Sequence, residues 1–267
     1  MQVREDANGN KIYVGEKVSI ADGNVKFNAR AGRNILFLEG NLKLGKSVIN
    51  FNGSGSVVFL SANKHPYHFR LMVHSNQAVY FGKNNFINRY DAAMQLILSE
   101  QKHFLMGSNC TVSFNTWVRN SDPHLIYSTE TKERLNPTRS VFIGDHVWIG
   151  QFATILKGTH IGSGSIIGAN AVVSGKIIPS NTIWAGNPAR QIKDKIFWAG
   201  RSVHNWKDAE TKKYAVMPTD IYTYERDGES LSFDKIDRAL SACRTAEDKM
   251  NYLLELSKNA AKNRFAI

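Results

Sequence analysis

The chain has 267 residues, of which 42% are hydrophobic and 21% charged, an ordinary composition for one large domain or for a domain with a smaller appendage. No apolar run approaches the roughly 18–20 residues that cross a bilayer, and the amino terminus lacks the apolar core of a signal peptide. We therefore expect a cytoplasmic protein with no membrane span. Cys110 and Cys243 are too far apart in the sequence to suggest a disulfide framework or a metal site.

The formal net charge is +11, and most of the surplus of Lys and Arg lies before residue 190. A basic surface favours anionic partners, such as nucleic acid, an acidic polymer or a phosphorylated cofactor. The sequence has no helix-turn-helix, zinc-finger or RNA-binding signature, so we expect no nucleic-acid partner. A need for solubility alone would equally explain a basic surface.

Short β-rich runs separated by Gly and Asn fill residues 12–80, as in ILFLEGNLKLGKSVINF and SGSVVFL. Apolar residues six positions apart then follow. They are Phe81 and Ile87, and later Met106, Val112 and Val118. These segments look like degenerate coils of one repeating structure.

The six-residue spacing becomes regular in IGDHVWIGQFATILKGTHIGSGSIIGANAVV, residues 143–173. A helix would need a period of about 3.6 residues and a single strand a period of about 2. A period of six instead fits a β-solenoid of short strands joined by tight corners, where glycine supplies a permissive backbone. The sequence therefore predicts a solenoid domain over residues 1–198. Its inward aliphatic positions are Ile143, Ile149, Ile155, Ile161, Ile167 and Val173.

Residues 119–140 interrupt the repeat, because the interval from Val118 to Ile143 is not a multiple of six. The stretch RNSDPHLIYSTETKERLNPTRS is polar and contains two prolines. It predicts a loop extruded from the coil, and long loops of this kind often carry function.

Residues 199–267 form a C-terminal extension after the repeat ends. Residues 199–231 have no clear pattern, whereas residues 232–264 have helical spacing, and TAED at 245–248 is a capping box between two helices. We expect this helical hairpin to cover the open end of the solenoid, which would otherwise expose backbone and apolar surface.

The SDPH of the loop, together with residues 143–193, closely resembles the hexapeptide-repeat acetyltransferases. Within them it is most similar to the O-acetyltransferases that modify bacterial capsules and polysialic acid. The resemblance covers about residues 104–198. It implies a left-handed parallel β-helix, a homotrimer, acetyl-coenzyme A as co-substrate with no metal, and a sugar hydroxyl of a surface polysaccharide as acceptor. The basic solenoid favours an acidic acceptor, such as polysialic acid.

The resemblance places the catalytic base at His124, and histidine suits this role because its ordinary pKa of about 6.5 lies near neutral pH. Asp122 or Asn120 could orient its ring or could instead cap the loop. His146 is a rival base, or a buried turn residue. Trp148 is expected to line the active site with its indole while its backbone N–H faces the thioester oxygen, although it could also be an aromatic residue of a subunit interface.

The last coils resemble the coenzyme-binding end of the family. We expect the pantetheine arm to follow the coil edge and basic residues beyond the GNPAR turn to meet the coenzyme phosphates. The stretch VVSGKIIP is one residue longer than the commoner VVTKDIP, so Lys176 need not occupy the position of the family's lysine. The residues implied are Trp148, Gly168, Ala169, Ser174, Lys176, Gly186, Arg190 and Lys193.

Other functions are compatible with a solenoid. N-acetylation of an amino sugar and acetylation of an antibiotic use the same donor. A metal hydratase built on the same coil needs three converging histidines, but His146 and His160 are fourteen residues apart, which does not match an eighteen-residue coil. A non-catalytic scaffold is a further alternative for any repeat protein.

Overall fold

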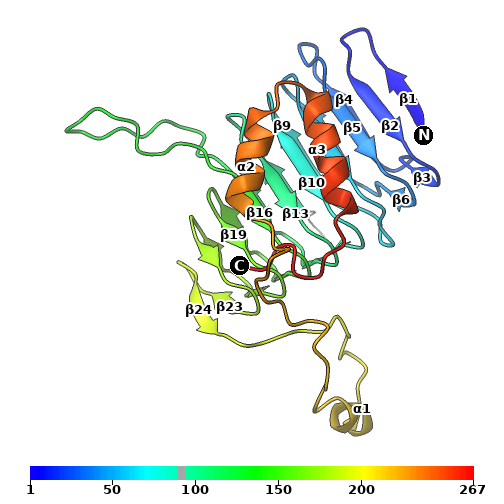
Figure 1. The fold of residues 1–267 in the computed structure, drawn as a ribbon, viewed down its shortest axis with the longest axis vertical. Helices are drawn as coiled ribbons and strands as arrows, with labels where there is room; N and C mark the ends of the chain where they lie inside the picture. The colour runs from blue at the N-terminus through cyan, green and yellow to red at the C-terminus, as the bar shows by residue number, and fades with distance from the viewer. Residues whose placement is uncertain (90–93) are drawn as a thin grey trace.

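The computed structural model describes residues 1–89 and 94–267. The chain winds into a parallel β-helix whose coils stack along one axis, with three sheets as its walls (Figure 1). The predicted fold class, a left-handed β-helix of hexapeptide repeats, is confirmed. Neighbouring strands within the sheets run parallel, apart from the antiparallel pairs β1–β2 and β23–β24 at the two ends.

The three sheets differ in length. In spatial order, the nine-stranded sheet contains β1 (Gln2–Glu5), β2 (Lys11–Val14), β5 (Ile35–Leu38), β8 (Val57–Leu60), β10 (Ala78–Phe81), β13 (Phe104–Met106), β16 (Val141–Ile143), β19 (His160–Ile161) and β22 (Ile177–Ile178). The seven-stranded sheet contains, in spatial order from the C-terminal end, β21 (Val172–Val173), β18 (Thr154–Leu156), β15 (Trp117–Arg119), β12 (Met94–Ile97), β9 (Phe69–Val73), β7 (Val48–Phe51) and β4 (Asn24–Phe27). The six-stranded sheet contains β11 (Phe86–Ile87), β14 (Thr111–Val112), β17 (Trp148–Ile149), β20 (Ile166–Ile167), β23 (Ile183–Ala185) and β24 (Arg190–Lys193), and a separate pair joins β3 (Val18–Ser19) to β6 (Leu42–Lys43).

The coils are wider near the N-terminus than in the regular repeat. Ile143 pairs with Ile161, 18 residues later, whereas Leu36 pairs with Val58, 22 residues later. The interpretation of residues 12–80 as coils of the same solenoid is therefore correct. Each of these coils, however, contains more residues than the three six-residue units of a regular coil. The wider coils enclose large aromatic side chains, and those buried inside the solenoid include Phe51, Tyr67, Phe69, Phe81 and Phe104.

Two helices of the C-terminal extension, α2 (Phe233–Ala242) and α3 (Ala246–Lys258), lie across the outer face of the nine-stranded sheet (Figure 1). The expectation that this hairpin covers the open end of the solenoid is therefore wrong. The reason is that strands such as β5 and β8 are buried on both faces: Leu36 points into the solenoid, while Ile35 and Phe37 form a second core with the helices. The predicted capping box is present, because the Thr245 and Asp248 side chains accept from each other's backbone N–H groups.

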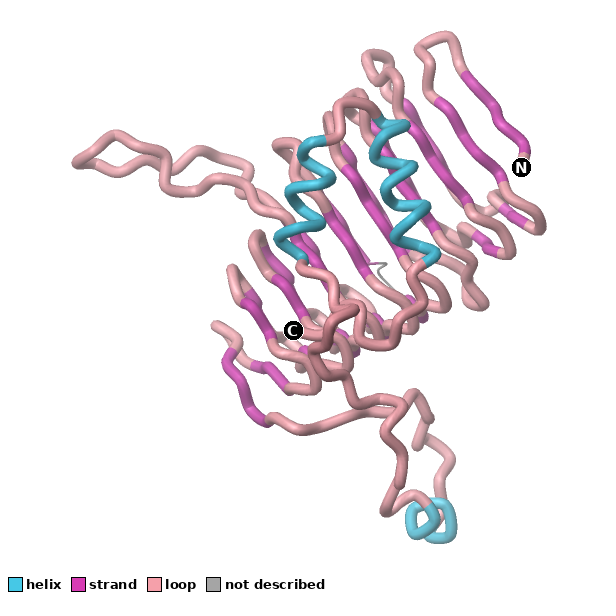
Figure 2. The backbone as a smooth tube through the Cα atoms, in the orientation of Figure 1, coloured by secondary structure: helices cyan, strands magenta, loops and turns pink. Residues whose placement is uncertain are grey.

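A buried ion pair fixes the end of the extension to the solenoid. Both Nε and Nη2 of Arg264 donate to the carboxylate of Asp145 at 2.7 Å, and Nη2 also donates to Ser108. Bidentate pairing of this kind fixes geometry as well as charge. By contrast, α1 (Asp208–Lys213) has no buried residue and projects away from the solenoid (Figure 2). Within residues 1–89 and 94–267, no helix is long and apolar enough to span a membrane.

We expect Leu253→Ala to destabilise the protein by about 2–5 kcal/mol, because it opens a cavity where α3 packs on the nine-stranded sheet. Urea unfolding followed by circular dichroism measures this change. The matched control is Val216→Ala at a side chain that is 77% exposed, which should change stability by less than about 0.5 kcal/mol. Equal midpoints for the two variants would show that the hairpin does not stabilise the sheet.

Candidate active site

Residues 120–140 connect β15 to β16 and project from the solenoid as one long arm (Figure 2). A single buried side chain organises the part that carries His124. Asn136 donates from Nδ2 to Asp122 Oδ2 at 2.9 Å and to the carbonyl of His124 at 2.8 Å, and its Oδ1 accepts from the Ile126 N–H at 2.9 Å. The backbone on either side of His124 is thereby held by one amide group.

The root of the loop is tied to neighbouring coils by polar contacts. Asp122 accepts from Lys157 Nζ in the next coil, and this hydrogen bond, followed by that from Asn136, lowers the pKa of Asp122. Asn120 is buried and bonds to backbone atoms of Ser99 and Lys102 in the preceding coil. Neither carboxylate nor amide hydrogen-bonds to the His124 ring, so both side chains cap and brace the loop in this structure.

The side chain of His124 is exposed and its ring makes no hydrogen bond to the described residues. The next three residues, Leu125, Ile126 and Tyr127, are each more than half exposed. Runs of exposed apolar side chains mark surfaces that contact another molecule. The loop therefore presents a free imidazole beside an uncovered apolar segment.

Trp148 lies on the outer face of the six-stranded sheet, and its side chain is 42% exposed. The expected role of its backbone is wrong, since the Trp148 N–H donates to the Ser165 carbonyl at 2.9 Å within the sheet and cannot face an oxyanion. The indole is free to line a pocket. It lies next to Trp198 of the segment after the repeat, with the ring centroids 5.9 Å apart.

His146 is held in an aromatic stack. Its ring lies flat between Trp198, at 4.0 Å between centroids, and Tyr222, at 4.6 Å. His146 Nε2 bonds to the Trp198 carbonyl, and the Trp198 indole N–H donates to the His146 carbonyl. Burial lowers the pKa of His146, which keeps its ring neutral near pH 7. This environment fits a structural turn residue better than a base that meets substrate.

The implied coenzyme residues lie on two edges of the solenoid. Gly168, Ala169 and Gly186 lie on the edge between the six- and seven-stranded sheets, whereas Ser174 and Lys176 lie on the edge between the seven- and nine-stranded sheets. Lys176 and Ser174 are exposed, and the Lys176 carbonyl accepts from the His160 N–H. Arg190 and Lys193 are exposed on the last strand, β24. Within a single chain, the implied coenzyme-binding residues therefore do not form one continuous site.

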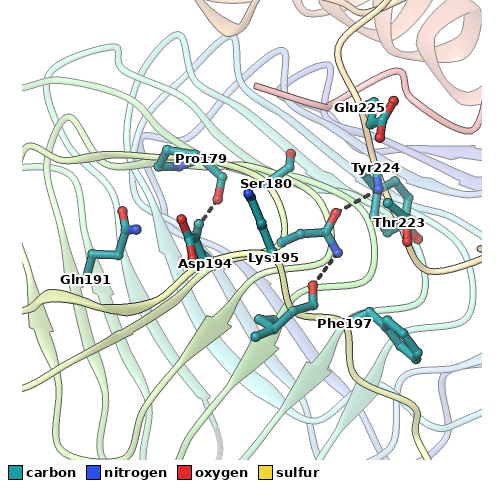
Figure 3. A pocket seen from close by; sticks show the side chains of 12 residues that line it. Pro179, Ser180, Gln191, Asp194, Lys195, Phe197, Thr223, Tyr224 and Glu225 are labelled. Carbon is teal, nitrogen blue, oxygen red and sulfur yellow. Dashed lines mark hydrogen bonds between the residues drawn. The ribbon is translucent and has the colours of Figure 1, made fainter. Parts of the chain in front are cut away.

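A cavity of about 450 Å³ lies at the end of the solenoid, between the last corner and the extension (Figure 3). Asn181 spans it, donating to the carbonyls of Ile196 and Tyr222 and accepting from the Tyr224 N–H. Lys195 lines this cavity together with Asp194 and Glu225. The two carboxylates outnumber the lysine, so the charge of the cavity does not favour a phosphate. Among the described residues, no group of three or more His, Cys, Asp or Glu side chains could hold a metal ion.

His124 and Trp148 belong to different sides of the solenoid. The loop leaves from the edge between the seven- and nine-stranded sheets, while Trp148 is on the six-stranded sheet, which forms the opposite wall. An aromatic pair, Phe114 and Phe152, lies on the edge between the six- and seven-stranded sheets, and Phe152 is 46% exposed. The two predicted catalytic residues of a single chain therefore do not form one pocket.

Sequence reasoning missed Asn136 and Trp198. The only sequence signal for Asn136 is the Asn-Pro pair in LNPT, which is typical of a turn but does not reveal which backbone groups the amide binds. Trp198 lies just beyond the repeat, in IFWAG. This segment has no periodic pattern, so the sequence could not reveal that Trp198 stacks on His146.

We expect Asn136→Ala to loosen the loop without unfolding the solenoid, because the loop loses the four hydrogen bonds of one buried side-chain amide. The amides protected within the loop, such as Leu135 N–H to Ile126, should exchange with solvent about tenfold faster or more. Hydrogen exchange read by mass spectrometry measures this, with exposed Asn205→Ala as control. Unchanged exchange at residues 121–136 would show that Asn136 does not organise the loop.

Comparisons with known proteins agree with this architecture. Residues 140–175 match the family model described as bacterial transferase hexapeptide (six repeats). The chain is 27% identical over 172 residues to a polysialic acid O-acetyltransferase of Neisseria meningitidis, covering 64% of this chain and 78% of that protein. It is 44% identical over 75 residues to a putative lipopolysaccharide biosynthesis O-acetyl transferase of Escherichia coli, covering 28% and 38% of the two chains.

Among solved structures, a polySia-specific acetyltransferase superposes with a TM-score of 0.64 at 24% identity, covering 77% of this chain and 93% of that one. This likeness concerns the fold. Residues 140–175 thus match the bacterial transferase hexapeptide repeat, and the chain is similar in sequence to acetyltransferases that carry it.

Proposed function

We propose that this protein transfers an acetyl group from acetyl-coenzyme A to a hydroxyl of an acidic bacterial surface polysaccharide, with polysialic acid as the leading candidate. The observation that carries the proposal is the free imidazole of His124 on an extruded loop of a hexapeptide β-helix. The relatives named above as O-acetyltransferases of polysialic acid and lipopolysaccharide support the acceptor class.

In the proposed reaction, His124 removes the proton of a sugar hydroxyl as that oxygen attacks the thioester carbonyl. The carbon–sulfur bond then breaks, the acetyl group stays on the sugar oxygen, and the imidazolium returns its proton to the leaving thiolate. One imidazole can perform both transfers, since the neutral ring accepts a proton and the imidazolium donates it. Because the Trp148 N–H is bonded within the sheet, the donor that stabilises the oxyanion must be another group.

Direct transfer fits the cysteines of this chain. Burial raises the pKa of the Cys110 thiol to about 12, and it also raises the pKa of Cys243. The thiolate is the reactive form of cysteine, so neither group is suited to carry an acetyl intermediate at neutral pH.

The coenzyme is best placed along the solenoid edges that carry Gly168, Ala169 and Ser174, with Trp148 against the acyl arm. Arg190 and Lys193 are exposed and suited to the coenzyme phosphates, as is Lys176 at the corner before β22. The cavity shown in Figure 3 is less suitable for phosphate, since two carboxylates line it against one lysine.

A homotrimer would complete the site. The helices cover the nine-stranded sheet, which leaves the six- and seven-stranded sheets for contact with other copies. Exposed aromatic side chains lie on both sheets and on the edge between them, namely Phe86, Trp117, Trp148 and Phe152. If this edge faces a threefold axis, the seven-stranded sheet of one copy meets the six-stranded sheet of the next. The loop with His124 then reaches a neighbour's Trp148.

We expect His124→Ala to lower kcat by about 10²- to 10⁴-fold while coenzyme A binding stays nearly unchanged, because only the base is removed. Release of free thiol from acetyl-coenzyme A in the presence of acidic and neutral glycans measures transfer, and calorimetry measures coenzyme binding. His204→Ala, at an exposed histidine of the extension, is the matched control.

Activity of His124→Ala within about tenfold of the wild type would rule out this base, since a general base contributes more than that. Faster acetylation of amino sugars or of antibiotics than of any polysaccharide would instead support the alternative acceptor class.

A further inference from the structure

Two neighbouring cavities of about 450 and 400 Å³ lie between the solenoid and the turn that joins α2 to α3. Asn76 and Arg244 line both cavities, so the two adjoin and we treat them together as one groove. We call it the edge groove, because its solenoid side consists of corners on the edge between the seven- and nine-stranded sheets. These corners contain Arg33, Ser54, Asn76 and Gln101, and the β1–β2 turn at Gly9 continues their row.

The edge groove is long and polar. It passes the β1–β2 turn and four successive corners, and because stacked strands are about 4.8 Å apart it extends roughly 19 Å. This length fits an oligosaccharide rather than a single sugar. Hydroxyl and amide groups line it, and they are suited to bond with sugar hydroxyls. They are Ser54, Ser75, Asn76, Gln101 and Ser241.

The half of the groove near the loop is cationic. Lys102, Arg244 and Lys249 line it, and no carboxylate does. Lys102 has one partner nearby, Asp237 at 3.7 Å, and the Arg244 side chain makes no ion pair within the described residues. Lys11, in the other half, is already paired with Glu247.

Lys249 gives the strongest indication of a missing ligand. Lys249 is only 2% exposed, and among the described residues its ammonium group has a single hydrogen-bond partner, the Cys243 carbonyl at 3.5 Å. An ammonium group has three donors, and a buried charge with so little compensation is costly. An anion in the adjoining cavity would supply the missing acceptors. A carboxylate on a sugar ring is such an anion.

The groove ends at the root of the loop that carries His124. The Lys102 carbonyl accepts from Asn120, the first residue of the loop, and Glu100 binds Arg134 farther along it. A chain lying in the groove is therefore directed toward this loop.

We propose that the edge groove binds a carboxylate-bearing polysaccharide at sugar residues remote from the one that is acetylated. This inference rests on the proposed function for the identity of the acceptor. It gives the helical hairpin a second role beyond covering the sheet, because Ser241, Arg244 and Lys249 all come from the hairpin.

The test compares two charge-matched double variants. Arg244→Ala with Lys249→Met removes two groove cations, and Arg238→Ala with Lys258→Met removes two exposed cations from the same helical hairpin. Calorimetry without any acetyl donor measures binding of a long sialic-acid oligomer and of the dimer. We expect the groove variant to bind the long oligomer at least about tenfold more weakly than the wild type, because it loses charge-assisted contacts. The control variant should bind the oligomer within about twofold of the wild type.

The same variants separate this inference from the proposed function. If the oligomer binds through the groove but no acetyl group is transferred, the inference stands and the proposed function fails. If transfer occurs but both double variants bind the oligomer equally well, the edge groove is not an acceptor site. Weaker binding of coenzyme A or of inorganic phosphate by the groove variant, with oligomer binding intact, would also overturn the inference. Exposed Arg33→Ala, at the far end of the groove, tests the same point if the buried Lys249→Met variant fails to fold.

Discussion

The in-register stacking of coils is the constraint on which the rest of the structure depends. Each strand donates to and accepts from the strand of the next coil, so the inward aliphatic positions must superpose from coil to coil. Val118 pairs with Ile155, and Met106 with Ile143, although the repeat is interrupted between them. The residues that interrupt the repeat all project from one corner of the coil, between β15 and β16. The position of His124 on an edge of the solenoid follows from this constraint.

The helical hairpin decides which faces of the solenoid stay available. Strands of the nine-stranded sheet are apolar on both sides, and their outer residues form a second core with α2 and α3. In the described part of the chain, no helix covers the seven- and six-stranded sheets in this way, and they expose Trp117 and Trp148. In our account these faces meet in the trimer, while the edge beside the hairpin guides the acceptor. The extension thus separates a face for assembly from a groove for substrate.

The sequence was sufficient to predict the solenoid, the loop and the two helices, because each leaves a local signal: a six-residue period, its interruption and a 3.6-residue period. It did not reveal where the hairpin packs. A signal was available, since runs such as ILFL, VVFL and AVYF are apolar without alternation, which is typical of strands buried on both faces. The contacts of Asn136, Trp198 and Lys249 could not be predicted, because they join segments far apart in the chain and no period relates them.

The central claim is that His124 of one copy acts beside Trp148 of the next. Mixed trimers of His124→Ala and Trp148→Ala chains test it most directly. A trimer made of either variant alone lacks one of the two residues in every site. Random assembly at equal amounts should restore about a quarter of the wild-type acetyl transfer, since that share of interfaces combines an intact loop with an intact indole in a closed ring of three. Mixed trimers, verified by light scattering, that stay inactive at every ratio would contradict a site shared between copies.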